Sequence, residues 1–291
     1  MTIKQSGSIP VAIISIGCIF AKCEDQKSFY HLISRGIDGI TGPPESHSHL
    51  QDYFDPDPKK PDHIYCNKGG YIPLTAFDPT EFSIPPNVIE ATDTSQLLSL
   101  ITAKRALEDA GYGENGKPFD RSKASVIIGV TGTQELVIPL SGRLGHPIWR
   151  QALKDSGISN DHADDVIHRI SNGYVEWQEN SFPGLLGNVV AGRIANRLDL
   201  GGTNCVVDAA CASSMGAIHL ALLELQSGRS DMVLTGGADT INDAFMHMCF
   251  SKTQILSPSG DIRPFSEDAD GTVLGAVSYT HLTLPTIYSV E

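Results

Sequence analysis

The chain has 291 residues, a hydrophobic fraction of 41% and a formal net charge of −13 at pH 7. This acidic balance argues against nucleic-acid binding, which needs a basic surface, and disfavours anionic membrane surfaces. No apolar run reaches the roughly 18 residues that span a bilayer, so we expect a globular protein with no membrane partner. From its acidic charge we expect no nucleic-acid partner. We expect the protein to be cytoplasmic.

The first part of the chain predicts one strand, two helices and a long irregular segment. Residues 9–20 are apolar and rich in β-branched side chains, which is typical of a buried strand. Residues 25–36 predict a helix that begins after a capping aspartate and ends at a glycine. Residues 41–90 are dense in proline, glycine, aspartate and histidine and predict a loop-rich insertion. Residues 92–110 have apolar side chains at three- and four-residue spacing and predict a second helix.

The second part of the chain alternates short apolar strands with helices. The sequence predicts strands over 124–130, 204–208 and 232–236, and helical structure over 146–180, 187–196 and 212–227. Because strands and helices alternate, we predict an α/β fold with a mostly parallel central sheet.

One cysteine stands in an unusual setting, the run VVDAACASSMGAIHL at 206–220. The valines end a predicted strand and Ala212 begins a predicted helix, so Cys211 lies at a strand-to-helix junction, at or next to a helix N-terminus. Such a sharp junction needs the small side chains that surround it. The free amides and the helix dipole at this position favour a thiolate and can hold a developing oxyanion. The local pattern leaves two interpretations open, a nucleophile or a small packing residue.

The remaining cysteines and the histidines lie in less suggestive settings. Cys205 enters a strand and Cys249 lies in an apolar run, so both are predicted to be structural. The six cysteines include no C-x-x-C pair, so we expect reduced thiols and no metal site. His219 lies about 12 Å of axial rise along the same helix from Cys211, so it cannot reach the thiol. His247 follows a strand and a turn that can bring it closer.

Four segments of the chain occur in an informative order. They are NVVAGRIANRLDLGG (188–202), VDAACASS (207–214), GRSDMVLTGGA (228–238) and RPFSEDADGTVLG (263–275). Together they resemble the N-terminal half of a β-ketoacyl synthase of the thiolase-like superfamily, and with the opening strand and helix the resemblance covers about 1–275. The loop-rich insertion and residues 179–188 are most similar to ketosynthase domains of bacterial polyunsaturated fatty acid synthases and type I polyketide synthases.

The resemblance implies a thiolase-like fold, of which this chain holds the N-terminal βαβαβαββ half, and 3-oxoacyl-[acyl carrier protein] synthase activity. Cys211 would receive an acyl group from an acyl carrier protein as a thioester, and its backbone amide would be one oxyanion donor. The carbanion of decarboxylated malonyl carrier protein would then attack that thioester. No cofactor is implied, because the carrier protein brings its own phosphopantetheine.

The same resemblance also marks what the chain lacks. Two histidines and a second, glycine-rich oxyanion loop lie downstream of the matching motifs in the family, and no segment here matches them. We therefore expect this chain alone to be inactive in condensation. After Gly275 the family continues with Glu-Gly, whereas this chain reads AVSYTHLTLPTIYSVE. We expect 276–291 to be an artefactual tail, such as translated adapter or vector sequence, with a divergent natural terminus as the alternative.

The resemblance also predicts how the complete protein assembles. Family members dimerise through the strand that leads into the nucleophile, here 204–208, so a homodimer is expected for the complete protein.

Two alternative functions remain open. One is a non-condensing partner that resembles a chain-length factor, although the presence of Cys211 speaks against it. The other is a thiolase-like acyltransferase that uses acyl-CoA.

Overall fold

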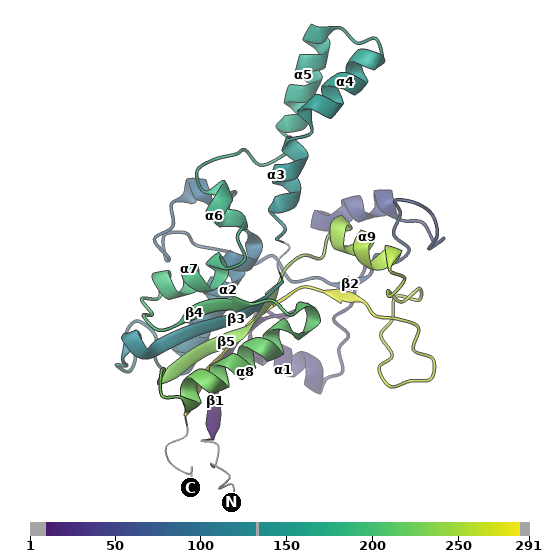
Figure 1. The fold of residues 1–291 in the computed structure, drawn as a ribbon. Coiled ribbons are helices and arrows are strands. Elements are labelled where there is room, and N and C mark those ends of the chain that lie inside the picture. Colours follow the sequence, from purple (N-terminus) through teal and green to yellow (C-terminus); the bar gives the residue numbers. More distant parts are fainter. Residues whose placement is uncertain (1–9, 132–133, 286–291) are drawn as a thin grey trace, which may run out of the picture.

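The computed structural model describes residues 10–131 and 134–285 of the chain. Within these residues a five-stranded sheet has the order β1-β7-β5-β3-β4, and β2 and β6 form a separate two-stranded sheet (Figure 1). The strands are β1 (Val11–Ile19), β2 (Gly69–Gly70), β3 (Ala124–Val130), β4 (Asn204–Val207), β5 (Met232–Asp239), β6 (Leu274–Gly275) and β7 (Val277–Pro285).

Helices cover both faces of the five-stranded sheet. The α-helices are α1 (Gln26–Ser34), α2 (Thr94–Asp109), α3 (Val137–Arg143), α4 (His146–Asp155), α5 (Asn160–Ser171), α6 (Ser181–Leu185), α7 (Val189–Arg197), α8 (Ser213–Gln226) and α9 (Ala244–Lys252). The short 3-10 helices are η1 (Glu45–Tyr53), η2 (Pro86–Val88), η3 (Arg121–Lys123) and η4 (Ala210–Ala212). Within the described residues, no helix is long and apolar enough to cross a membrane.

The strand directions confirm the predicted fold class. β3 runs parallel to β4 and β5, whereas β7 runs antiparallel to both β5 and β1. β1, β3, β4 and β5 therefore share one direction and β7 is reversed, so the sheet is mostly parallel. The predicted strand at 124–130 has the observed bounds, while the strand predicted at 232–236 extends to Asp239.

One face of the sheet, which we call the closed face, is covered by α2 and α7. Val126, Ile128 and Leu234 point to this side and belong to one large buried cluster with α2 residues such as Leu100. β1 comes so close to α2 that a Cβ atom on Gly17 would lie 2.0 Å from the carbonyl oxygen of Thr102. The main apolar core of the described chain thus lies on the closed face.

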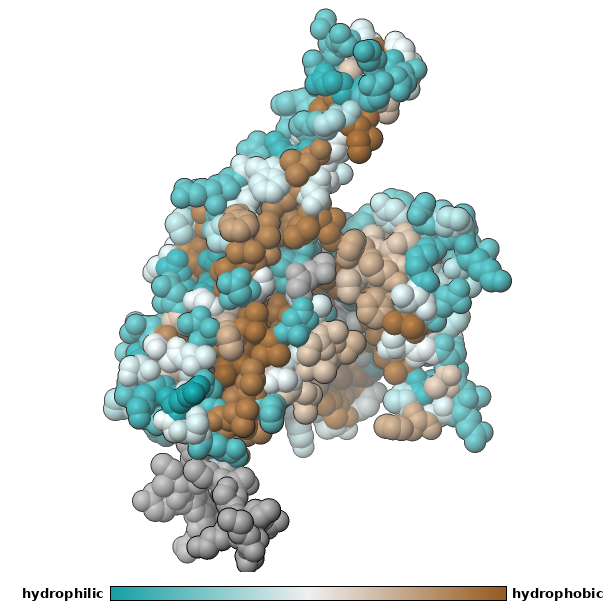
Figure 2. All heavy atoms as spheres, viewed as in Figure 1, coloured by the Kyte–Doolittle hydropathy of each residue, from teal (hydrophilic) through white to brown (hydrophobic). Residues whose placement is uncertain are grey.

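The opposite face of the sheet, which we call the open face, carries α8. Ile127 and Val233 point to this side and pack against Ala217, Ala221 and Leu225 of α8. The outer side of α8 remains uncovered, and its exposed apolar side chains are Met215, Leu220 and Leu223. Figure 2 shows apolar side chains gathered over α8 on this side of the molecule. A helix that carries apolar side chains on its outer side as well as on its inner side is usually buried on both sides. The open face, where the outer side of α8 is exposed, therefore differs from an ordinary solvent-facing surface.

The segment predicted to be helical over 146–180 forms two helices rather than one. α4 and α5 make a hairpin that projects away from the sheet and is reached through α3 (Figure 1). Gly157, with a φ of +78°, lies in the connection between them, and residues 172–180 are not helical. Glycine tolerates this left-handed conformation without steric cost, which explains the break.

The last described residues are part of the central sheet. β7, which falls within the segment expected to be an artefact, lies between β1 and β5. On its closed-face side the buried hydroxyls of Ser278 and Thr280 lie 3.2 and 3.3 Å from the Thr102 hydroxyl. β7 therefore places polar side chains at a position where buried strands usually carry valine, isoleucine or leucine.

Candidate active site

Cys211 lies in the 3-10 turn η4, directly between β4 and the first residue of α8. This position confirms the predicted strand-to-helix junction. The side chain is exposed rather than packed in the core. Ala210, which precedes it, has a φ of +49°, in the left-handed region that alanine rarely adopts. The backbone is therefore strained at the residue that turns Cys211 outward.

Two side chains hold this strained turn in place. The amide of Ala210 donates to Asp208 Oδ1 at 3.1 Å. The amide of Ala209 donates to Ser213 Oγ at 2.9 Å, and Ser213 Oγ donates to the Ala210 carbonyl at 2.7 Å. Because these bonds fix the residues on both sides of Cys211, the turn is rigid before any ligand arrives.

Two glycines of the sheet let α8 begin close to it. Gly129 of β3 and Gly237 of β5 are register partners. A Cβ atom on Gly129 would lie 2.5 Å from the Ser213 carbonyl carbon, and one on Gly237 would lie 3.0 Å from Ser214 Cβ. Neither residue was predicted from the sequence, although glycine inside a strand often marks such a close backbone approach.

A cavity of about 400 Å³ opens beside Cys211. Two residues of α9, Met246 and Phe250, form one apolar side, and Val277 and Tyr279 of β7 form another. The remaining lining residues are Gly129, Thr131, Ala210, Ser213, Ser214, Gly237, Ala238 and Asp239. Burial raises the pKa of the Asp239 carboxyl, although a hydrogen bond from the Ile241 amide opposes the shift. A mainly apolar cavity with a nucleophile at its rim suits an acyl chain.

The other candidate residues lie elsewhere. His219 is exposed on α8, as expected, and His247 is fully buried in α9; neither lines the Cys211 cavity. Cys205 is half-buried in β4, and burial raises the pKa of its thiol. The prediction that Cys249 is part of the core was wrong, because this side chain is exposed on α9.

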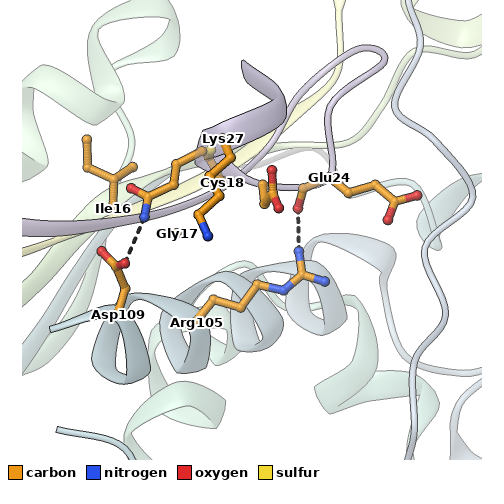
Figure 3. Close-up of a pocket in the computed structure, with 9 residues that line it drawn as sticks. Ile16, Gly17, Cys18, Glu24, Lys27, Arg105 and Asp109 are labelled. Atoms are coloured by element: carbon orange, nitrogen blue, oxygen red, sulfur yellow. Dashed lines mark hydrogen bonds between the residues drawn. The ribbon is translucent and has the colours of Figure 1, made fainter. Parts of the chain in front are cut away.

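A second cavity, of about 320 Å³, lies beside the start of α1 (Figure 3). Two of its charged side chains have neutral partners: Arg105 donates to the Glu24 backbone carbonyl at 2.5 Å, and Asp109 accepts from the Gln26 amide at 2.8 Å. Burial raises the pKa of the Cys18 thiol in its wall to about 11, so this thiol is protonated at neutral pH. Cys18 is therefore a weaker candidate for a nucleophile than an ordinary exposed thiol. Within the described residues, no group of histidine, cysteine and acidic side chains could hold a metal ion.

Comparison with protein families identifies the class to which this fold and site belong. Residues 8–276 match the model of the β-ketoacyl synthase N-terminal domain. The chain therefore belongs to the β-ketoacyl synthase family, and the resemblance inferred from its motifs is confirmed. The match ends one residue after the boundary proposed at 275.

Individual relatives of the chain are much longer synthases. It is 35% identical to a polyunsaturated fatty acid synthase of Thraustochytrium sp. over 91% of the chain and 9% of that protein. It is 31% identical to a phenolphthiocerol/phthiocerol polyketide synthase of Mycobacterium tuberculosis over 94% of the chain and 11% of that protein. The chain thus spans about a tenth of the length of each of these relatives.

Solved structures show the same fold. The oxazolomycin ketosynthase domain of Streptomyces albus superimposes with a TM-score of 0.72 at 23% identity, over 94% of this chain and 42% of that one. The ketosynthase from module 6 of the bacillaene synthase of Bacillus subtilis gives a TM-score of 0.71 at 23% identity, over 95% of this chain and 40% of that one. The thiolase-like ketosynthase architecture predicted from the sequence is thereby confirmed.

Proposed function

We propose that Cys211 is the acyl-accepting nucleophile of a 3-oxoacyl-[acyl carrier protein] synthase. One observation carries this proposal: an exposed thiol stands on a strained, braced turn at the amino end of α8 and opens into an apolar cavity. The free amides at that end can stabilise the oxyanion that forms when the thiolate attacks a carbonyl. Membership of the β-ketoacyl synthase family supports the assignment.

The proposed reaction has two steps. The Cys211 thiolate attacks the carbonyl of an acyl thioester on an acyl carrier protein, and the phosphopantetheine thiolate of the carrier leaves. Malonyl carrier protein then loses carbon dioxide, and the resulting carbanion attacks the Cys211 thioester and releases the thiolate. The amide of Cys211 is the oxyanion donor that this chain supplies. No cofactor of its own is proposed, because the carrier protein supplies the phosphopantetheine.

We further propose that the isolated chain carries out only the first step. The second step needs groups that assist decarboxylation, and no histidine is present among the described residues that line the Cys211 cavity. The uncovered apolar surface of α8 supports the view that another layer of protein completes this side of the site.

We also propose a cytoplasmic location for the protein. Its six free cysteines suit that setting.

A homodimer through β4 is part of the proposal. β4 is an edge strand that pairs with β3 on one side, and its residue Asn204 is exposed. An exposed edge presents amides and carbonyls on which a second copy can add its own strand. The predicted dimer strand at 204–208 therefore lies where such pairing is possible.

We also propose that residues 276–291 are foreign to the domain. The family match ends at 276. In β7 the buried Nδ1 atom of His281 has no hydrogen-bond partner among the described residues, and desolvation lowers the pKa of that histidine. An unpaired buried polar atom costs about 1–3 kcal/mol, so β7 suits its position in the sheet poorly. Sequencing the source DNA across the Gly275 codon tests this, and a confirmed natural reading frame through 291 would refute it.

The nucleophile is tested by timed alkylation with iodoacetamide, followed by peptide mass spectrometry. Cys249 is a matched control, because it is also exposed but lies near the end of α9 rather than at a helix N-terminus. We expect Cys211 to react about tenfold faster or more, since the thiolate is the reacting form. Equal rates would favour the non-condensing partner. An acyl donor preference for coenzyme A over carrier protein would favour the acyltransferase.

A further inference from the structure

The loop-rich insertion contacts the segments that precede and follow α9. Before the helix, Asn242 donates through Nδ2 to the Gly70 carbonyl at 3.3 Å. After it, the Tyr65 hydroxyl donates to the Leu256 carbonyl at 2.8 Å. Lys68 donates to the Ser259 carbonyl at 3.3 Å and forms an ion pair with Asp261 at 3.2 Å. The insertion is therefore joined to the chain on both sides of α9.

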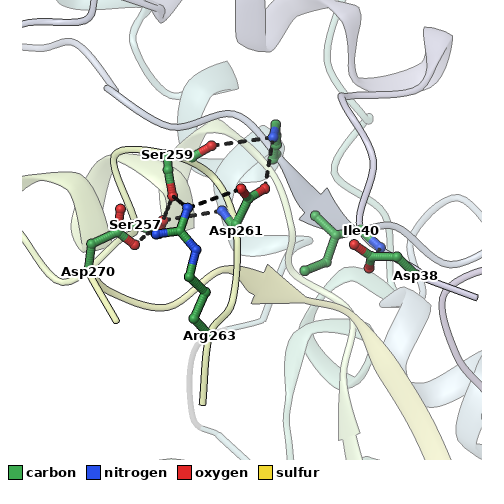
Figure 4. A network of polar contacts seen from close by, with 8 residues as sticks. Asp38, Ile40, Ser257, Ser259, Asp261, Arg263 and Asp270 are labelled. Carbon is green, nitrogen blue, oxygen red and sulfur yellow. Dashed lines mark hydrogen bonds and ion pairs between the residues drawn. The ribbon is translucent and has the colours of Figure 1, made fainter. Parts of the chain in front are cut away.

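The loop that follows α9 is itself held by a polar network (Figure 4). Ser257 donates to Asp270 at 2.7 Å, and Arg263 lies within 3.4 Å of Asp261. The segment that follows α9 is therefore a loop, and the bond between Ser257 and Asp270 joins its two ends. Within α9 itself, Ala244 and Met248 pack against a buried cluster of the insertion, formed by Leu50, Ile64 and Tyr71.

His247 fixes the middle of α9. Its side chain is fully buried, and Nδ1 lies 3.0 Å from the carbonyl oxygen of Cys66 in the insertion. Nε2 lies 3.1 Å from Asn242 Oδ1 and 3.4 Å from the Tyr71 hydroxyl. A single imidazole thus connects the helix to two residues of the insertion.

The Cys66 carbonyl determines which ring nitrogen of His247 carries the proton. A carbonyl oxygen can only accept, so Nδ1 donates to it. Nε2 of the neutral ring then carries no proton, so its contacts with Asn242 and Tyr71 add no hydrogen bond donated by the ring. An apolar side chain at this position would leave the buried Cys66 carbonyl without its donor.

The neighbours of His247 in sequence connect it to the proposed reaction. Met246 directly precedes His247, and Phe250 lies about one helical turn after Met246. Both residues line the Cys211 cavity. His247 itself points away from that cavity into the insertion. The insertion contacts this apolar side of the cavity through His247 and also directly, because Phe250 packs against Tyr65 and Cys66.

We propose that His247 is a positioning residue that fixes the side of the Cys211 cavity formed by Met246 and Phe250, and so sets which acyl chain lengths Cys211 accepts. This inference rests on the proposed function of Cys211. It differs from a role in the chemistry, because His247 is not among the residues that line the Cys211 cavity. If α9 is free to shift, the cavity loses its preference for chains that fill it.

The test is a competition between two alkylating probes on the 291-residue chain, iodoacetamide and N-hexyl iodoacetamide. In each reaction the thiolate sulfur forms a C–S bond, and iodide leaves as the C–I bond breaks. The measured quantity is the ratio of long-probe to short-probe labelling at Cys211, with exposed Cys249 as the internal reference. We expect the wild-type ratio at Cys211 to exceed that at Cys249, because the apolar cavity binds the hexyl chain.

Three variants separate positioning from general damage. His247→Leu removes the donor but keeps the volume, and we expect the Cys211 ratio to fall about tenfold towards that of Cys249. His247→Gln restores a donor, and we expect it to recover much of the ratio. His219→Ala removes an exposed histidine from α8, and we expect no change. Circular dichroism and the thermal midpoint report whether each variant is folded.

The possible outcomes distinguish the two proposals. An unchanged ratio in folded His247→Leu, or an equal loss of labelling with both probes, would overturn the positioning role. If that variant fails to fold, Asn242→Ala replaces it, because it removes one partner of His247; a wild-type ratio in Asn242→Ala would again refute the role. If wild-type Cys211 is labelled no faster than Cys249 by either probe, the proposed function of Cys211 fails instead.

Discussion

The two faces of the central sheet differ in how completely they are covered. On the closed face, α2 and α7 bury a large apolar cluster, and Leu100 of α2 is fully buried. On the open face, α8 is also rich in apolar residues, yet Leu223 is 48% exposed and Met215 is 67% exposed. The closed face stabilises the fold, whereas the open face carries Cys211 and exposes apolar surface. Stability and chemistry are thus assigned to opposite sides of one sheet.

The largest expected effect comes from a matched pair of leucines on the two faces. Leu100→Ala removes a fully buried side chain from the closed face and should reduce the free energy of unfolding by about 2–5 kcal/mol. Leu223→Ala on the open face should cost less than about 1 kcal/mol, because that side chain is already half-exposed. Urea unfolding of both variants measures the difference. Equal losses would show that the open face is as well packed as the closed one.

The second prediction concerns pH and Glu135, which lies in the connection between β3 and α3. Burial, together with Asp93 and Asp243, raises the pKa of Glu135 from 4.5 to about 7. The folded chain then binds more protons than the unfolded chain between these values, so the contribution of Glu135 to stability is greatest below pH 4.5 and is lost as the pH rises through 7.

Glu135→Gln isolates that contribution from the other titrating groups. The variant should be more stable than the wild type at about pH 8, by at most about 3 kcal/mol, and close to it at about pH 5. Thermal unfolding at the two pH values measures this difference. A stability gain that is the same at both pH values would show that Glu135 is not held protonated.

The third prediction concerns the strained turn of the open face. Ala210→Gly should stabilise the fold by about 0.5 kcal/mol, since relief of the left-handed strain exceeds the extra entropy of glycine in the unfolded chain. Ala212→Gly is the matched control, because Ala212 has an ordinary φ of −96° and should lose about 0.5–1 kcal/mol. Chemical denaturation compares the two. The strain account would be wrong if both variants lost stability equally.

The smallest expected effect on stability comes from making the open face polar. Leu220 and Leu223 are both exposed on α8, so the double change to lysine should alter the free energy of unfolding by less than about 0.5 kcal/mol. The same variant should bind less of an apolar fluorescent dye, because less apolar surface remains. A large fall in the thermal midpoint would mean that these side chains are packed in solution, for example against a second copy.

The sequence predicted the parts of the molecule that depend on local pattern. β3 is a continuous apolar run, and the small residues around Cys211 identified the junction between β4 and α8. The interruption between α4 and α5 was missed, although Gly157 was a local signal for it. Cys249 lies in an apolar run, and composition alone did not show that α9 turns it outward.

The features that the sequence did not predict depend on contacts between distant segments. Gly129 and Gly237 become the support for α8 only once β3 and β5 pair in register. Cys66 and Tyr71, which contact His247, lie 181 and 176 residues away in the insertion, so its role as an anchor is visible only in the fold. β7 lies in the segment that we expected to be foreign, yet it pairs with both β1 and β5 inside the sheet.

The central claim, that Cys211 accepts an acyl group, is tested most directly by acyl transfer to the purified chain. The chain is incubated with a hexanoyl thioester of N-acetylcysteamine, and the added mass is located by peptide mass spectrometry, with Cys211→Ser as the control. We expect one hexanoyl group on Cys211, none on Cys249, and none in the variant. Acylation of Cys249 at the same rate, or no acylation of Cys211 in a folded chain, would contradict it.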